Sequence, residues 1–143
     1  MKLPLTIVTA LTLAATSAFA GWTQNYDKAL EQAAQEKKLV LLDFTGSDWC
    51  GWCMKLDKET FSKPAFKDFA DKNLVLVTVD FPQGKKLPAS VQKQNDDLKT
   101  KFQVNGFPTL ILVDGTGKEI ARNPGYLAGG PAAFVSWVES ARK

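Results

Sequence analysis

No histidine occurs in this sequence of 143 residues, and only two cysteines do. Without histidine the chain cannot form a Ser-His-Asp or Cys-His catalytic arrangement, a metal site with imidazole ligands or an imidazole proton relay. Two cysteines are also too few for the multiple bridges that hold disulfide-rich scaffolds together. Stability must therefore come from a hydrophobic core, and any chemistry must use groups other than imidazole.

Strong charge of one sign is lacking as well. Lys and Arg number 18 against 15 for Asp and Glu, a formal net charge of +3, and no run of five like charges occurs. A balance this weak predicts no nucleic-acid partner. With 45% hydrophobic and 23% charged residues, the composition is typical of a globular protein, and the length is that of one domain.

Residues 1–20 have the composition of a signal peptide rather than of a folded segment. A single lysine precedes an apolar run over residues 3–15, and Ala18-Phe19-Ala20 supplies the small residues at which signal peptidases cleave. An uncleaved membrane anchor is the alternative, but the run is shorter than the roughly 20 residues that cross a bilayer. We predict cleavage after Ala20 and a periplasmic or secreted protein, with no stable membrane insertion afterwards. That destination is oxidising, so a cysteine pair is a candidate disulfide.

Hydrophobic periodicity predicts alternating helices and strands in the rest of the chain. Near-continuous apolar runs predict buried strands, and Asp114-Gly115-Thr116-Gly117 predicts a hairpin turn between two further strands. Thr23 or Asn25 is expected to cap the first helix, and Ser62 a later short one. This order predicts a mixed sheet with helices on both faces. The expected helices are 26–38, 50–60, 62–69, 89–102 and 130–141, and the expected strands are 39–44, 74–79, 109–113 and 118–122.

Cys50-Gly51-Trp52-Cys53 is the constellation that can carry chemistry. Two thiols three positions apart at the start of a helix lie on one face, close enough for a bridge. Unpaired N–H groups and the helix dipole favour the thiolate of Cys50, which is the nucleophile of disulfide exchange. Cys53 could then resolve the mixed disulfide from within the same turn.

Two cysteines at this spacing also occur in haem attachment sites, zinc sites and structural disulfides. A c-type haem requires histidine after the second cysteine, where Met54 stands, and zinc requires four ligands, of which this chain offers two thiolates, so we expect no metal site. A static structural disulfide remains open, although a bridge that closes four residues removes little chain entropy. The residues alone favour a redox pair over a structural bridge.

Three separated motifs resemble those of the thioredoxin-fold family. They are Asp43-Phe44, the W-C-G-x-C pattern at residues 49–53, and Val104-Asn105-Gly106-Phe107-Pro108-Thr109, which is similar to the segment with the family's cis-proline. Family members also carry glycines where Gly125 and Gly129-Gly130 stand. The resemblance covers nearly all of residues 25–142. It implies an α/β, thioredoxin-like fold in residues 21–143, with a central mixed β-sheet of about four strands flanked by helices on both faces.

The resemblance also implies roles for individual residues. Cys50 would attack, and Cys53 would be the buried resolving cysteine. Asp43 would be a buried carboxylate, its pKa raised by burial, that accepts the Cys53 proton, although a charge merely flanking a strand is the alternative. A cis bond between Phe107 and Pro108 would expose a backbone edge to an extended substrate, whereas a plain strand-opening proline would not.

The residues around the cysteines are expected to face the substrate. Trp49 would pack beside Cys50 and exclude water, or it could have a purely core role. The sequence departs from thioredoxin at Trp52, which replaces a proline or histidine, and at Leu76, which stands about where thioredoxins carry a lysine. There is an extra residue between Asp43 and Cys50, and segment 81–100 is longer. The substrate-binding candidates are Trp49, Gly51, Trp52, Phe107 and Pro108.

These observations together predict an exported thiol–disulfide oxidoreductase that exchanges disulfides with protein thiols, on the reducing or isomerising side. It would need no cofactor beyond its own dithiol, and a membrane-embedded thiol donor would recharge it. The alternative is a thioredoxin-fold binding or chaperone module whose disulfide stays closed. The two hypotheses differ in whether the Cys50–Cys53 disulfide can be reduced and re-formed within the cellular range of reduction potentials.

Overall fold

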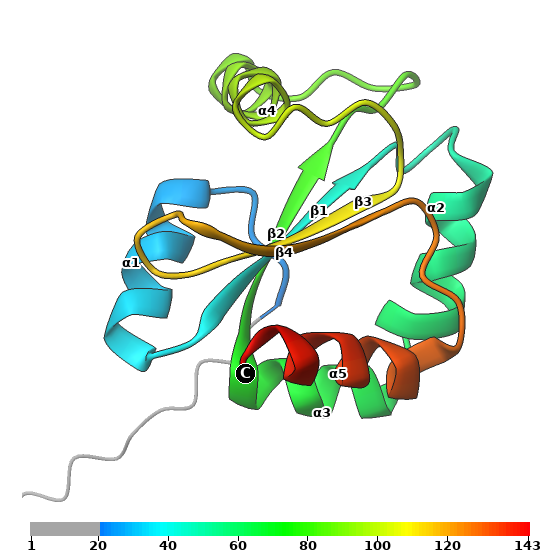
Figure 1. The fold of residues 1–143 in the computed structure, drawn as a ribbon. Coiled ribbons are helices and arrows are strands. Elements are labelled where there is room, and N and C mark those ends of the chain that lie inside the picture. The colour runs from blue at the N-terminus through cyan, green and yellow to red at the C-terminus, as the bar shows by residue number, and fades with distance from the viewer. Residues whose placement is uncertain (1–20) are drawn as a thin grey trace, which may run out of the picture.

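The computed structural model describes residues 21–143, so the predicted signal peptide and its cleavage site lie outside the described residues. Four strands form one sheet in the order β2-β1-β3-β4 (Figure 1). β1 is parallel to β2 and antiparallel to β3, and β3 is antiparallel to β4, so the sheet is mixed as expected. The strands are β1 Leu39–Thr45, β2 Leu74–Asp80, β3 Thr109–Val113 and β4 Glu119–Pro124.

Helices cover both faces of this sheet, as Figure 1 shows. One face carries two helices, and the other carries three helices and a π-helical turn that continues the first of them. The first group is α1 Tyr26–Glu36 and α4 Ala89–Lys101; the second is α2 Gly51–Leu56, η1 Asp57–Phe61, α3 Pro64–Asn73 and α5 Gly130–Ala141. In the described part of the chain, none of the helices is long and apolar enough to cross a membrane.

The central strand β1 divides the core into two halves. Val40, Leu42 and Phe44 are fully buried against the α1 and α4 side, whereas Leu41 is buried on the side of α2, α3 and α5. A strand covered on both faces needs apolar residues at successive positions, which explains its unbroken hydrophobic run. Asp43 shares the alternation of Leu41 and therefore lies on the face that α2 covers.

One of the expected helix caps is present in the structure and another is not. Asn25 caps α1, since its Oδ1 accepts a hydrogen bond from the Lys28 N–H at 3.0 Å. Ser62 does not cap α3: Lys63 holds that position, and the Ser62 hydroxyl donates instead to the Lys58 carbonyl. The prediction of a Ser62 cap was wrong because the proline at position 64 suits the first helical turn and moves the cap one residue later.

The helix that carries the cysteines is shorter than the sequence predicted. α2 ends at Leu56, and the chain widens into the π-helix η1, where the Ser62 N–H bonds to the Asp57 carbonyl. π-helical turns within helices are frequent near functional sites. Here the turn buries Thr60 and Phe61 against the sheet, and it brings Glu59 to the hydroxyl of Tyr126.

Candidate functional site

Cys50 and Cys53 form a disulfide with their Cα atoms 5.3 Å apart. Cys50 is the N-cap of α2, and its sulfur accepts a hydrogen bond from the backbone N–H of Cys53 at 3.3 Å. Their exposed fractions are only 7% and 5%. When the bond is open, an N–H directed at this sulfur favours the thiolate of Cys50 over its thiol. The pair thus has the geometry of a nucleophile with a resolving thiol beside it.

Asp43 lies in the middle of β1, between Thr78 of β2 and Leu110 of β3. It is 9% exposed, and its Oδ1 has no hydrogen-bond partner among the described residues. Burial raises the pKa of this carboxyl to about 7, and the charges of Asp57 and Asp80 contribute in the same direction. A carboxyl with such a pKa can both accept and release a proton near neutral pH.

The peptide bond between Phe107 and Pro108 is cis, as the resemblance implied. Pro108 is buried directly before β3, and its carbonyl accepts the Gly125 N–H at 2.8 Å. The ring of Phe107 meets that of Trp49 edge-on, with centroids 5.8 Å apart. The cis-proline loop therefore lies beside the loop that leads into the disulfide.

Trp49 is not a core residue, since 41% of it is exposed. Its indole N–H donates to the Phe81 carbonyl at 2.7 Å, which fixes the ring against the end of β2. The ring also covers Gly46, where any Cβ would lie 2.3 Å from it. Glycine at this position is what allows the indole to fold back over the loop.

Gly46→Ala should therefore destabilise the protein. The added methyl group would push the half-exposed indole away from Phe81 and break its hydrogen bond to that carbonyl, a loss of about 1 kcal/mol. Urea unfolding followed by circular dichroism measures the effect. Gly51→Ala is the matched control, because no atom lies within 4 Å of a Cβ there. Equal unfolding midpoints for the two variants would contradict the packing described for Trp49.

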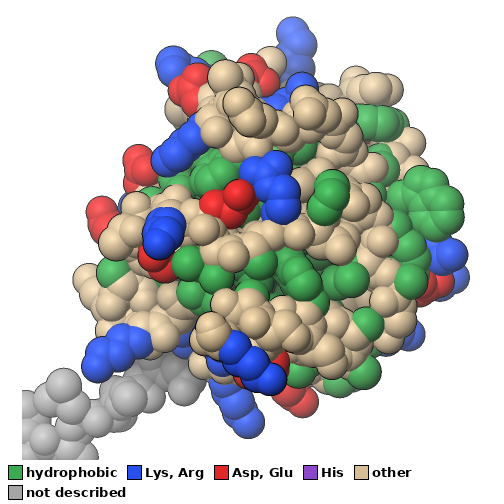
Figure 2. Space-filling model, viewed as in Figure 1, with side chains coloured by type: hydrophobic (Ala, Val, Ile, Leu, Met, Phe, Trp, Pro, Cys, Tyr) green, Lys and Arg blue, Asp and Glu red, His purple; other side chains and the backbone are tan. Residues whose placement is uncertain are grey.

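On the other side of Cys50, Trp52 is 58% exposed, and its ring lies 5.3 Å from that of Tyr126. The Lys55 ammonium sits 5.1 Å from both ring centroids. Met54 is also exposed, so Trp49, Trp52 and Met54 are three exposed apolar side chains close to Cys50 in the chain. In Figure 2, hydrophobic side chains gather at the edge of the molecule where Figure 1 places α2. Exposed apolar surface next to a reactive disulfide fits contact with another polypeptide.

Sequence reasoning missed a polar network behind the disulfide loop. The Asp80 carboxylate accepts hydrogen bonds from the N–H and the hydroxyl of Ser47, at 2.9 and 2.5 Å. Asn95, which is 1% exposed, donates to the Asp80 carbonyl at 3.0 Å. The available signal was a carboxylate at the end of a buried strand, where polar groups need partners.

Within residues 21–143, no three His, Cys, Asp or Glu side chains gather closely enough to hold a metal ion. The described site offers two cysteine sulfurs and the Asp43 carboxyl. Its parts come from three places in the chain: α2 with the loop before it, the strand β1 and the loop before β3.

Comparisons with known proteins agree with this geometry. Residues 26–142 match the family model described as a thioredoxin-like domain. The disulfide bond reductase DsbH of Chlamydia pneumoniae is 44% identical over 120 residues, which are 84% of this chain and 72% of that protein. A solved structure of a DsbH oxidoreductase is 40% identical, with a TM-score of 0.80, and covers 96% of this chain and 94% of its own.

More distant relatives extend the comparison. The thiol:disulfide interchange protein DsbD of Actinobacillus pleuropneumoniae is 32% identical over 107 residues, which are 73% of this chain but 16% of that protein. A thioredoxin from Thermus thermophilus, at 18% identity and a TM-score of 0.64, shares the fold and covers 87% of this chain and 88% of its own. The chain therefore belongs to the thioredoxin-like domain family, as a thiol–disulfide oxidoreductase with its cysteine pair at residues 50 and 53.

Proposed function

We propose that this protein reduces disulfide bonds of exported proteins by exchange through Cys50 and Cys53. The observation that carries the proposal is the Cys53 N–H directed at the Cys50 sulfur at the start of α2. Similarity to a protein named disulfide bond reductase, over most of both chains, supports the reducing direction. Export rests on the pattern of residues 1–20 and is part of the proposal.

The exchange takes two steps. In the first, the Cys50 thiolate attacks a substrate disulfide, forms a mixed disulfide and releases one substrate thiolate. In the second, the Cys53 thiolate attacks the Cys50 sulfur, forms the Cys50–Cys53 disulfide and releases the second substrate thiolate. Two electrons pass from the dithiol to the substrate, and the protons on the thiols go to water or to a nearby base.

We assign the base to Asp43. The Cys53 thiol is buried and must lose its proton before it can attack. Asp43 lies on the face of β1 that α2 covers, and its pKa of about 7 lets it take up a proton at neutral pH. A fully ionised surface carboxylate would be a much weaker base for this purpose.

The substrate would lie across Trp49, Gly51, Trp52 and the Phe107–Pro108 edge. Trp49 and Trp52 are exposed on either side of Cys50, and Gly51 leaves the space between them open. The backbone edge at a cis-proline can pair with an extended segment, as in strand addition. Substrates in this arrangement are unfolded or extended segments that contain a disulfide.

We expect a reduction potential between roughly −270 and −180 mV, the values of thioredoxin and of disulfide isomerase. Strong oxidants stabilise the thiolate of the attacking cysteine further, commonly with a histidine inside the motif, and here that position is Trp52. Redox titration against glutathione and an insulin-reduction assay test this expectation. A midpoint near −120 mV would make the protein an oxidant, and a disulfide that stays closed in both assays would favour a binding module.

A reductant in an oxidising compartment has to be recharged from outside it. We propose a membrane-embedded thiol donor for this role, since the similarity to part of DsbD connects the chain with thiol:disulfide interchange. Such a donor would attack the Cys50–Cys53 disulfide by the same exchange, run in reverse.

A further inference from the structure

Hydrogen bonds hold the segment that follows β2, residues 81–87, against the loop that precedes Cys50. One carboxylate makes the main link: Asp48 accepts hydrogen bonds from the Gln83 and Gly84 N–H groups, at 2.9 and 2.7 Å. These bonds hold the pKa of Asp48 below its ordinary value, so it stays ionised. The indole of Trp49 adds a bond to the Phe81 carbonyl at 2.7 Å. The 81–87 loop thus has one defined position relative to the disulfide.

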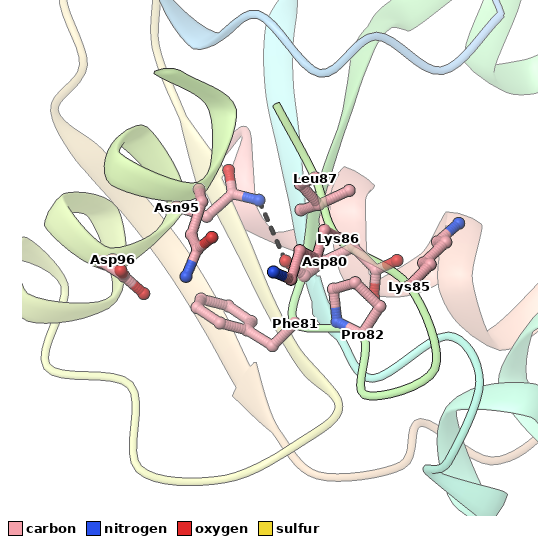
Figure 3. A pocket seen from close by; sticks show the side chains of 9 residues that line it. Asp80, Phe81, Pro82, Lys85, Lys86, Leu87, Asn95 and Asp96 are labelled. Carbon is pink, nitrogen blue, oxygen red and sulfur yellow. Dashed lines mark hydrogen bonds between the residues drawn. The ribbon is translucent and has the colours of Figure 1, made fainter. Parts of the chain in front are cut away.

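A pocket of about 500 Å³ lies between the 81–87 loop and α4 (Figure 3). Phe81, Pro82 and Leu87 supply apolar walls, and Gln92 and Asn95 of α4 supply polar ones. Figure 3 shows Asn95 on α4, with Phe81 and Pro82 on the segment that follows β2. The formal charges that line the pocket cancel, so the lining has no net attraction for an anion or a cation. The charged lining residues are Asp80, Lys85, Lys86 and Asp96.

The pocket connects to the substrate edge through two aromatic contacts. The Trp49 and Phe107 rings are 5.8 Å apart, and the Phe107 and Phe81 rings are 5.2 Å apart. Phe81 is itself a wall of the pocket. An extended chain advances roughly 3.3 Å per residue, so about three residues would lead from the Trp49 ring, next to Cys50 in the chain, to this wall. A small-molecule disulfide would not extend that far.

We propose that the 81–87 loop and α4 form a specificity pocket for an apolar side chain of the protein segment whose disulfide Cys50 attacks. The inference rests on the proposed reductase function and adds the kind of sequence that the protein prefers. Asp48 is a positioning residue in this arrangement, because it holds the loop without touching the substrate.

The test compares two cystine peptides that differ at one position. Each carries either Leu or Ser at the third residue on both sides of its cysteine, and 2-hydroxyethyl disulfide serves as a small substrate. Reduction rates are followed by stopped-flow fluorescence of the tryptophans beside the disulfide. Each peptide rate is divided by the same variant's rate with 2-hydroxyethyl disulfide, so that a general loss of chemistry cancels.

Two substitutions probe the pocket, each with a matched control. Gln92→Trp fills the pocket from α4, and Gln35→Trp places the same side chain on the exposed surface of α1. Asp48→Ala releases the 81–87 loop, and Asp114→Ala removes a carboxylate that likewise accepts two backbone N–H groups, in the β3–β4 turn.

The unmodified protein should reduce the Leu peptide about five-fold faster than the Ser peptide. This ratio is smaller than the one that full burial of a leucine side chain would give. In Gln92→Trp and Asp48→Ala the ratio of the Leu-peptide rate to the Ser-peptide rate should fall close to one. In the two controls, Gln35→Trp and Asp114→Ala, the five-fold preference should remain. No preference in the unmodified protein, or a preference that persists in Gln92→Trp, would overturn the pocket. Failure to reduce any of the three disulfides would instead contradict the proposed reductase function.

Discussion

Cys53→Ser is expected to hold substrate proteins in a covalent mixed disulfide when the variant is expressed in the exporting cell. Cys50 can still attack, but a serine hydroxyl cannot displace the substrate from its sulfur. Multiple turnover should fall by several orders of magnitude, as for other enzymes that lose a reacting group. Non-reducing gels and mass spectrometry of the purified variant would detect the adducts.

The matched control is Cys50→Ser, which should form no such adducts. Cys53 lies one turn inside α2, away from the N-cap position where the Cys50 sulfur accepts a backbone N–H, so it should not replace Cys50 as the attacking group. Adducts that persist in Cys50→Ser, or the absence of adducts in Cys53→Ser, would contradict the proposal that protein disulfides are the substrates.

Asp43→Asn should make the oxidised protein more stable at pH 8 and leave its stability unchanged at pH 4. The pKa of Asp43 is about 7 in the folded protein, against 3.8 for an ordinary aspartate. Between these values the folded state binds more protons than the unfolded chain, so the free energy of unfolding falls as pH rises. Ionised Asp43 then costs up to about 4 kcal/mol at pH 8, since each pKa unit corresponds to roughly 1.4 kcal/mol.

Urea unfolding at pH 4, 6 and 8 measures this difference. Asp68→Asn is the control, because it removes an exposed carboxylate on α3. Its free energy of unfolding should equal that of the unmodified protein at each pH. A stability difference that does not change between pH 4 and pH 8 would show that Asp43 does not titrate in this range.

The same Asp43→Asn substitution separates a catalytic role from a structural one. If Asp43 accepts the Cys53 proton, its replacement should slow reductive turnover near neutral pH by about 10²-fold at most, the low end for general base catalysis. The inflection near pH 7 in the rate profile should disappear with it. An unchanged rate and pH profile would assign Asp43 to the structure alone.

The elements that the sequence predicted well are those whose pattern is local. β1 follows from a run of apolar residues, because a strand covered on both faces has no polar side. The Cys50–Cys53 pair follows from a spacing of three residues within one helical turn. The π-helix at Asp57 was not foreseen, since its apolar spacing is close to that of an ordinary helix over so few residues.

Individual roles were harder to infer where burial decided them. The sequence allowed Trp49 to be either a core residue or a cover for the disulfide, since a single aromatic residue in a turn has no periodicity. The structure leaves it half exposed and bonded to Phe81, 32 positions away. The cis bond at Pro108 was expected only through the family resemblance, because a proline alone permits both isomers.

By itself the sequence determined the strands, the helices apart from η1, and the cysteine pair, because periodic burial and short-range spacing depend on neighbouring residues. Only the tertiary structure decided what surrounds that pair. The bonds from Asp48 to the 81–87 loop join residues 35 and 36 positions apart, and Tyr126 meets Glu59 over 67 positions. Such contacts depend on where the sheet places the ends of its strands, and irregular loops carry no repeating signal of their partners. The pKa of Asp43 is likewise set by burial, which the elements packed around β1 produce together.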